Sequence, residues 1–299
     1  MGVSIRTIRI GTRGSPLALW QANFIADRLR WHGAAVELQI IQTKGDRVQD
    51  VPLAQLGGDG LFTKAIQDSV LEGQSDIAVH SLKDLPTLPV RGLTLAAVPP
   101  RGPVGDALIS NKFKRFDDLP KGARVASGSQ RRKAMLLHRR PDLQLEDLRG
   151  NIETRLRKLT EQNLDAIILA EAGLVRLELT NCITEILNPD WMVPAVGQGA
   201  LGLECRSDDS EMLQLLRHIS DPPTFAAVSA ERSFLLAMGG GCQIPLGANA
   251  VVAGHRLRLR GVLLSADGRE RRDATEEGPV AEATDVGKRL AERIRALAV

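Results

Sequence analysis

Strand-like and helix-like segments alternate along the first two-thirds of the chain, and this alternation restricts the possible folds more than any other feature. Ile8 and Ile10 alternate as in a buried strand, and apolar residues then recur at helical spacing over residues 16–29. Such a βα rhythm predicts parallel sheets with helices on both faces. The same pattern predicts strands at 36–40, 77–79, 123–126 and 165–169 and helices at about 61–73, 129–140 and 151–163.

The rhythm changes near residue 222, beyond which a helix, strands around 257–264 and a closing helix over about 281–297 favour a small α+β domain. The apolar segment 200–205 is predicted to return to the first sheet, as in two-lobed clamshell folds. We therefore expect an α/β fold with a two-lobed clamshell and a small C-terminal α+β domain. The predicted domains are residues 1–99 with 200–218, residues 100–199, and residues 219–299.

Composition excludes several classes of protein. The chain has 299 residues and is 43% hydrophobic, too apolar for a disordered protein, yet no aliphatic run approaches the about 20 residues of a membrane span. The start lacks a basic segment followed by an apolar core, so we expect no export signal and a cytoplasmic protein. A net charge of +3, no Tyr and 3% aromatic residues argue against nucleic-acid binding.

The cysteines and histidines do not predict a metal site. Cys182, Cys205 and Cys242 are too scattered for a disulfide framework or zinc, and the five histidines lack metal-ligand spacing. Cys205 ends an apolar run and is interpreted as a core residue. Cys242 follows three glycines on a loop shaped for close approach. Because a lone loop cysteine is usually inert, the residues alone leave its role open.

Polar side chains gather where the predicted strands end, which is where open α/β sheets bind ligands. Arg13 and Ser15 follow the first strand at the start of a helix, and Lys83 and Asp84 follow the strand at 77–79. An ordinary turn would also explain Arg13 and Ser15, and an ordinary solvated loop would explain Lys83 and Asp84. For each pair, the structural and the functional interpretation therefore stay open. Asp84 would otherwise serve as a general acid/base or as a stabiliser of a cation.

A third cluster, residues 127–132, opens a helix directly after a predicted strand. Its hydroxyl groups, helix N-terminal amides and two arginines would together form a cradle for a carboxylate. Arg149 and Asn151 repeat this arrangement, with Arg155 one turn along the helix, and Arg176 adds a further charge. The 30 arginines against 9 lysines indicate either codon bias or many guanidinium forks for carboxylates or phosphates.

Eight segments resemble one known family, in order and at that family's spacing. By these motifs the sequence is similar to the porphobilinogen deaminase (hydroxymethylbilane synthase) family. The segments are RIGTRGSPLALWQA (9–22), GLFTKAI (60–66), DIAVHSLKDLPT (76–87), RRPDL (139–143), LRGNIETRLRKL (148–159), DAIILAEAGLVRL (165–177), PAVGQGALGLECR (194–206) and GGGCQIPLGA (239–248).

The resemblance implies a periplasmic-binding-protein-like clamshell with a third, small domain, and a monomeric transferase of haem and other tetrapyrrole biosynthesis. The family joins four porphobilinogen units head to tail with loss of ammonia, on a covalent dipyrromethane cofactor, and releases hydroxymethylbilane. Every pyrrole carries an acetate and a propionate, so the resemblance also gives the arginines a ligand.

Individual residues take family roles by the same resemblance. Cys242 is implied as the thioether attachment site of the dipyrromethane, and Asp84 as the catalytic aspartate. The implied cofactor contacts are Lys83, Asp84, Ser127, Ser129, Arg131 and Arg132. The implied substrate contacts are Arg13, Ser15, Gln21, Arg149, Asn151, Arg155, Arg176 and Gln198.

Two positions and one segment depart from the family pattern, and the segment is the predicted hinge at 101–106, which lacks charges common in the family. The loop at 44–60 resembles a mobile lid, but Asp59 stands where the family often has Lys. Gly128 stands where the family usually has Ser, which removes one hydroxyl from the cradle.

Two other classes of function compete with this assignment. A non-catalytic clamshell protein that binds a small anion would use Arg13, Arg131 and Arg132 but would need neither Asp84 nor Cys242. A phosphoryl-transfer enzyme would need a phosphate-binding loop, and no G-x-x-x-x-G-K-[ST] motif occurs.

Overall fold

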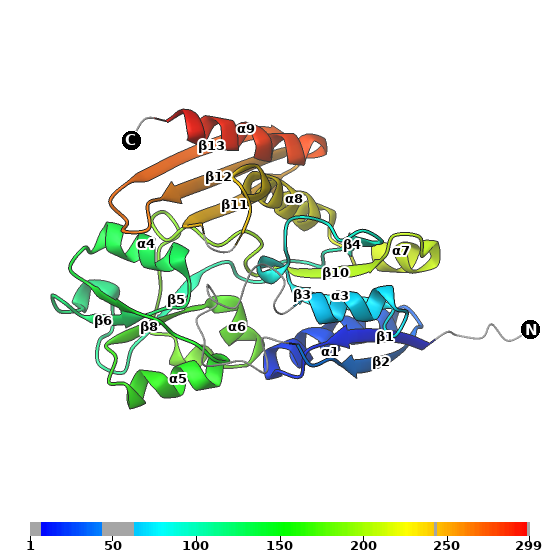
Figure 1. Ribbon diagram of the computed structural model, residues 1–299, viewed down its shortest axis with the longest axis horizontal. Helices are drawn as coiled ribbons and strands as arrows, with labels where there is room; N and C mark the ends of the chain where they lie inside the picture. Colours follow the sequence, from blue (N-terminus) through cyan, green and yellow to red (C-terminus); the bar gives the residue numbers. More distant parts are fainter. Residues whose placement is uncertain (1–6, 44–62, 242–243, 298–299) are drawn as a thin grey trace, which may run out of the picture. The chain divides into compact units, whose positions relative to one another are not determined.

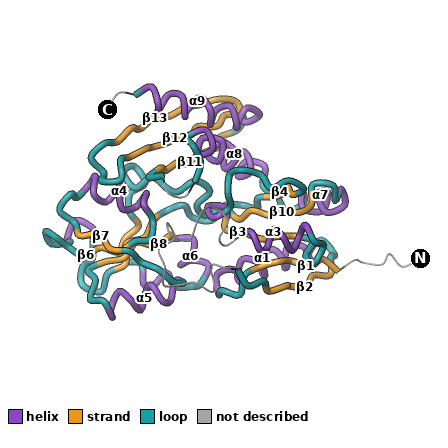
Figure 2. Tube along the Cα trace, viewed as in Figure 1, coloured by secondary structure: helices purple, strands orange, loops and turns teal. Residues whose placement is uncertain are grey.

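The computed structural model describes residues 7–43, 63–241 and 244–297. Figure 1 labels the helices and strands, and Figure 2 distinguishes them from the loops by colour. Within these ranges, no helix is long and apolar enough to cross a membrane.

The first of two compact units comprises Met1–Arg101 with Ala200–Phe225 and is built on a five-stranded sheet of order β2-β1-β3-β10-β4. Strands β2, β1 and β3 are parallel, whereas β10 runs antiparallel to its neighbours β3 and β4. The elements are β1 (Thr7–Thr12), α1 (Pro16–Trp31), β2 (Ala35–Ile40), α3 (Lys64–Leu71), β3 (Ile77–Ser81), the 3₁₀ turn η1 (Leu82–Asp84), β4 (Leu93–Ala97), β10 (Leu201–Arg206) and α7 (Ser210–Arg217).

Strand β10 comes from far along the sequence yet lies inside this sheet, which confirms the predicted return of the segment at 200–205. All its residues except Arg206 are buried. Cys205 is completely buried in the core, as interpreted from the sequence, and burial raises the pKa of its thiol to about 11. The strand therefore joins β3 to β4 through both hydrogen bonds and apolar packing.

Helix α1 illustrates how local sequence produces the elements of this unit. The Ser15 hydroxyl accepts a hydrogen bond from the Ala18 amide at 3.4 Å, and Pro16 occupies the first helical position. Ile25 and Leu29 are completely buried among the strands of the sheet. A helix that is capped at its N-terminus and buried along one face is thus fixed directly after β1.

The second compact unit, Gly102–Gly199 with Ala226–Val299, contains two sheets. The larger has the order β7-β6-β8-β5-β9, in which β7, β6 and β8 are parallel and β5 runs antiparallel to β8 and β9. Its elements are β5 (Asp106–Ile109), β6 (Arg124–Ala126), α4 (Gln130–Arg139), β7 (Gln144–Glu146), α5 (Ile152–Glu161), β8 (Ala166–Ala170), α6 (Glu171–Arg176) and β9 (Glu185–Ile186).

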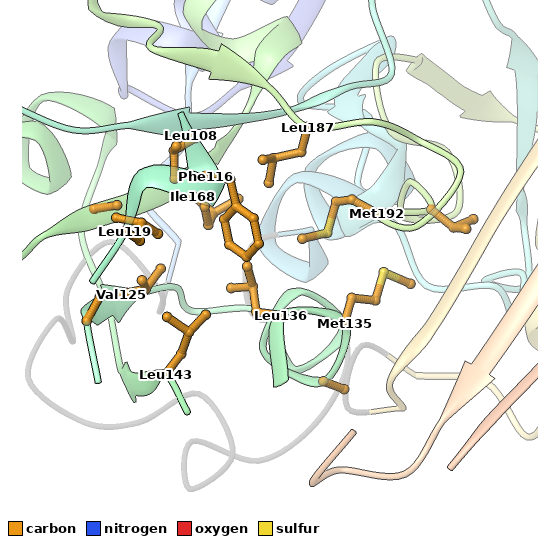
Figure 3. Close-up of a cluster of buried hydrophobic side chains, with 14 of the residues drawn as sticks. Leu108, Phe116, Leu119, Val125, Met135, Leu136, Leu143, Ile168, Leu187 and Met192 are labelled. Atoms are coloured by element: carbon orange, nitrogen blue, oxygen red, sulfur yellow. The ribbon is translucent and has the colours of Figure 1, made fainter. Parts of the chain in front are cut away.

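The smaller sheet is antiparallel, with the order β11-β12-β13, and two helices accompany it. Side chains of β12 share a core with the larger sheet, in which Phe116 packs among Leu136 and Ile168 (Figure 3). This region confirms the predicted C-terminal α+β element, and the two larger sheets confirm the α/β class; the three-domain division stays a prediction. The elements are α8 (Pro222–Ala237), β11 (Leu246–Ala253), β12 (Arg256–Leu264), β13 (Arg271–Pro279) and α9 (Ala283–Ala296).

Candidate functional site

A pocket of about 80 Å³ lies in the first unit, where β1 and β3 end. This is the edge at which open α/β sheets bind ligands. Its polar lining consists of Arg13, Ser15, Gln21, Thr63, His80, Ser81 and Asp84. The structure therefore brings together four predicted site residues, which lie up to 71 positions apart in the sequence.

Asp84 is held at this pocket by the turn that follows β3. The 3₁₀ turn η1 places the buried Leu82 in the core and leaves Asp84 exposed at the end of the turn. Lys83 lies between them and is half-buried. The Asp84 carboxylate therefore lies just beyond the end of a buried strand, where a ligand can reach it.

Gln21 and His80 have partners in this unit. The Gln21 amide nitrogen donates to the Ser81 hydroxyl at 2.8 Å. His80 Nε2 lies 3.0 Å from Glu204 Oε2, and the Gln67 amide donates to the same oxygen at 2.9 Å. The sequence pattern placed His80 directly after the strand at 77–79 and gave no sign that its ring would line a pocket.

A second group of predicted residues surrounds a buried carboxylate in the second unit. Arg131 Nη1 lies 2.7 Å from Asp106 Oδ2, and Arg132 Nη2 lies 2.7 Å from Asp106 Oδ1. Burial alone would raise the pKa of Asp106, but the two guanidinium charges outweigh it and hold that pKa well below its usual range. Two cations and one carboxylate leave the cluster with a net positive charge.

Arg131 has hydrogen-bonding capacity that the described residues do not use. Its Nη1 donates to Asp106 and to the Val193 carbonyl at 2.6 Å. Its Nε and Nη2 atoms find no hydrogen-bond partner in the described part of the chain, although the side chain is 4% exposed. Because these two N–H groups lie on one edge of the guanidinium, they match the two oxygens of a carboxylate.

The residues before Arg131 form a tight loop at the start of α4. The Ser129 hydroxyl accepts from the Arg132 amide at 3.4 Å, and the Ser127 hydroxyl accepts from the Ser129 amide at 3.3 Å. A Cβ on Gly128 would lie 2.6 Å from the Leu148 carbonyl oxygen. The loop therefore packs against Leu148 more closely than any other residue at position 128 would permit.

The helix start at α5 carries the next predicted residues. The Asn151 side chain caps α5 by accepting from the Thr154 amide at 2.8 Å. Arg155 Nε donates to the Gly150 carbonyl at 2.8 Å, and Arg149 Nε is buried with no hydrogen-bond partner among the described residues. One of these arginines is thus fixed by the backbone, while the other keeps a buried donor.

The remaining predicted contacts gather at residues 197–199. Gln198 is completely buried, and its amide nitrogen donates to Asp106 Oδ1 at 2.9 Å and to the Val104 carbonyl at 2.7 Å. Arg176 Nη2 donates to the Gly199 carbonyl at 2.6 Å. Burial lowers the pKa of Arg176 to about 10, so the guanidinium stays charged at neutral pH. Sequence reasoning missed the Gln198–Asp106 link because no local pattern connects residues 92 positions apart.

Two predicted features lie outside the described residues. These are Cys242 and the loop at 44–60 with Asp59. The structure does describe Gly239, Gly240 and Gly241, which all have positive φ angles of 106°, 65° and 102°. Such angles favour glycine, so these residues form a turn between the end of α8 and Cys242.

The fold and these basic clusters define an α/β protein suited to a small ligand with several carboxylates. Comparison with known proteins makes the assignment specific. The family model "Porphobilinogen deaminase, dipyromethane cofactor binding domain" matches residues 8–214, and "Porphobilinogen deaminase, C-terminal domain" matches residues 225–296. The chain belongs to the porphobilinogen deaminase family. The family, transferase class and dipyrromethane cofactor predicted from the sequence are thereby confirmed.

Curated relatives agree over almost the full length. The porphobilinogen deaminase of Syntrophotalea carbinolica is 49% identical over 296 residues, which cover 98% of this chain and 94% of that protein. The porphobilinogen deaminase of Geobacter sulfurreducens is 48% identical over 296 residues, covering 98% and 93%. These relatives favour the enzyme over the non-catalytic anion-binding alternative.

The matches among solved structures are more distant. A putative methionine-binding lipoprotein from Bacillus subtilis has 13% identity and a TM-score of 0.44, covering 71% of this chain and 89% of that one. The methionine-binding protein MetQ has 14% identity and a TM-score of 0.44, covering 76% and 94%.

Proposed function

We propose that this chain joins four porphobilinogen units head to tail into hydroxymethylbilane, with Asp84 as the catalytic carboxylate and Cys242 as the attachment site of the dipyrromethane. The observation that carries the proposal is the exposed Asp84 carboxylate in the same pocket as Arg13. Family membership over nearly the whole chain supplies the reaction. A monomeric state and a cytoplasmic location stay predictions.

Asp84 has the position and the chemistry for each condensation step. The bond between the aminomethyl carbon of porphobilinogen and its protonated nitrogen breaks, neutral ammonia leaves, and the remaining carbon carries the positive charge. A carbon–carbon bond then forms at the free α-carbon of the acceptor pyrrole, which loses a proton. The Asp84 carboxylate stabilises the cation and accepts that proton, which later passes to solvent or ammonia.

The basic side chains bind the acetates and propionates. Arg13 and Ser15 face the pocket that holds Asp84, so we assign them to the incoming substrate. Arg131 offers a two-donor edge, and Arg149 offers a buried Nε. Because guanidinium groups pair with carboxylates through two parallel hydrogen bonds, these arginines also orient the pyrrole rings.

The residues present fit a dipyrromethane. The unused edge of Arg131, 4% exposed, offers two parallel N–H donors, which a carboxylate of the cofactor would satisfy. Ser127, Ser129 and Arg132 of the same unit would complete its surroundings there, and Lys83 stays a predicted contact. When bound, the dipyrromethane supplies the free pyrrole α-carbon at which the first porphobilinogen is joined. The thiols of Cys182 and Cys205 are poor attachment sites, since burial raises the pKa of both.

Intact-protein mass under denaturing conditions tests the proposal. We expect the wild-type chain to carry the mass of two pyrrole units and to gain further one-pyrrole steps after porphobilinogen is added. Cys242→Ser should lose the resident mass, whereas the control Cys182→Ser should keep it. Asp84→Ala should keep the resident mass but gain no further steps, because the carboxylate acts in elongation.

Each variant can contradict its own assignment. A resident mass that persists in Cys242→Ser would place the thioether elsewhere, and normal elongation in Asp84→Ala would remove Asp84 from catalysis. A wild-type chain that neither carries the mass nor loads from preformed hydroxymethylbilane would favour the non-catalytic anion-binding protein.

A further inference from the structure

Three consecutive residues, 197–199, connect to three different parts of the second unit, and we call them the junction. The Gly197 amide donates to Glu231 Oε2 at 2.7 Å. Gln198 donates to Asp106, the carboxylate that holds Arg131 and Arg132, and Gly199 accepts from Arg176. The junction therefore contacts Asp106, which holds Arg131 and Arg132, and it also contacts Arg176 directly.

Glu231 fixes the junction from the other side. It lies on α8 and is completely buried. Its Oε2 accepts from Gly197, and its Oε1 accepts from the Ala250 amide of β11 at 2.8 Å. A buried carboxylate is costly unless hydrogen bonds compensate for its lost hydration, so this side chain holds a defined position. The reaction steps above make no use of Glu231.

The junction has little room to move independently of its neighbours. Gly199 has a φ of 83°, and a Cβ there would lie 2.6 Å from the carbonyl oxygens of Gly102 and Pro103. The Gly102 amide also donates to the Gly199 carbonyl at 3.1 Å. With the backbone this closely packed, a shift at Gly197 also moves Gln198 and Gly199.

We propose that Glu231 is a positioning residue that acts through the junction to place Arg131, Arg132 and Arg176. Loss of one Glu231 hydrogen bond displaces Gln198 from Asp106 and the Gly199 carbonyl from Arg176. The arginines then bind carboxylates less well, while Asp84 and the reacting carbon atoms are untouched. This inference rests on the function proposed above, in which these arginines hold the carboxylates of pyrrole rings.

Glu231→Gln tests the inference, because the new amide NH₂ group faces a backbone N–H and one acceptor is lost. We expect KM for porphobilinogen to rise by about fivefold while kcat stays within about twofold, the pattern of weakened binding without damage to the chemical step. A second measurement incubates the apo full-length chain with preformed hydroxymethylbilane and follows the gain of cofactor mass by intact-protein mass. We expect the rate of this loading to fall by about fivefold for the same reason.

Ser233→Ala is the matched control on the same helix. Its hydroxyl donates to the Thr284 carbonyl at 2.7 Å, away from the junction. We expect the control to lower thermal stability slightly and to leave KM and loading unchanged. If Glu231→Gln lowers the unfolding temperature but matches Ser233→Ala in KM and loading, Glu231 is only a structural residue and the inference is wrong.

A second variant tests the same link should Glu231→Gln fail to fold. Gln198→Asn withdraws the amide from Asp106 by one methylene, and we expect the same rise in KM and the same slower loading. Unchanged values there would also overturn the inference. If instead the wild-type chain gains no pyrrole mass, the proposed function itself fails, and that result is distinguishable from either variant outcome.

Discussion

Asp106 shows how a single residue organises the second unit. It is completely buried at the start of β5, and each of its oxygens receives an arginine. Removing one partner of such a pair leaves uncompensated buried charge, which costs about 3–5 kcal/mol. Asp106 therefore supports both the fold and the shape of the candidate carboxylate site.

Acid should weaken this support in a defined pH range. The pKa of Asp106 is lowered in the folded state, so the folded chain binds fewer protons than the unfolded chain near that pKa. Its stabilisation is complete above the unfolded pKa of about 3.9 and is lost as pH falls from there toward the folded value. We expect the difference in unfolding free energy between wild type and Asp106→Asn to be constant from pH 7 to about 5 and to shrink below about pH 4. Parallel stability curves down to pH 3 would contradict this role.

The sequence revealed the arginines of the site but not this carboxylate. Arg131 and Arg132 stand next to hydroxyl groups at a helix start, a local pattern that is readable along the chain. Asp106 lies 25 residues before Arg131 and 92 before Gln198. Such a partnership depends on which strands become neighbours, and sequence periodicity does not specify that.

At the scale of elements, helices α8 and α9 of the C-terminal region approach each other unusually closely. A Cβ on Gly287 of α9 would lie 2.4 Å from the Ala230 carbonyl oxygen and 2.8 Å from the Phe234 amide nitrogen, both on α8. Backbone atoms cannot rotate away as a flexible side chain can. A glycine in the middle of a helix is therefore explained here by packing.

We expect Gly287→Ala to destabilise the protein by about 2 kcal/mol. Alanine gains about 1 kcal/mol of helix propensity, but the overpacking against α8 costs more. The exposed neighbour Lys288, which pairs with Asp285 on the surface, provides the control. Lys288→Ala should change the unfolding free energy by less than about 0.5 kcal/mol. Denaturant unfolding measures both, and a more stable Gly287→Ala variant would show that the two helices have room to separate.

Helices were more predictable than strands, for physical reasons. The helices predicted at 129–140 and 151–163 are confirmed as α4 and α5 with only their ends adjusted. Strand β13 has the sequence RRDATEEGP and no alternation of apolar residues, and among the described residues it pairs with β12 alone. Backbone hydrogen bonds and cross-strand ion pairs such as Arg260 with Asp273 hold it instead. Pairing of this kind leaves no hydrophobic period in the sequence.

At the scale of the whole molecule, the first unit is assembled from both sides of a long insertion. Residues 102–199 form part of the second unit, and the chain then returns to supply β10 and α7 to the first. The apolar segment at 200–205 made this return predictable, since it reads as a buried strand with no partner nearby in the sequence.

The position of β10 has a consequence for synthesis on the ribosome. Until residue 206 has emerged, β3 and β4 each lack the strand that lies between them, and their unpaired edges stay open. The strands in the first hundred residues therefore cannot complete their sheet until about two hundred residues have been synthesised. We expect stalled nascent chains exposed to residue 199 to be cleaved by protease within β3 and β4, and chains exposed to residue 225 to be protected there. Equal protection at both lengths would mean that β3 and β4 become protected without β10 between them. The synthesis of β10 therefore sets the time at which the N-terminal strands are no longer exposed to aggregation.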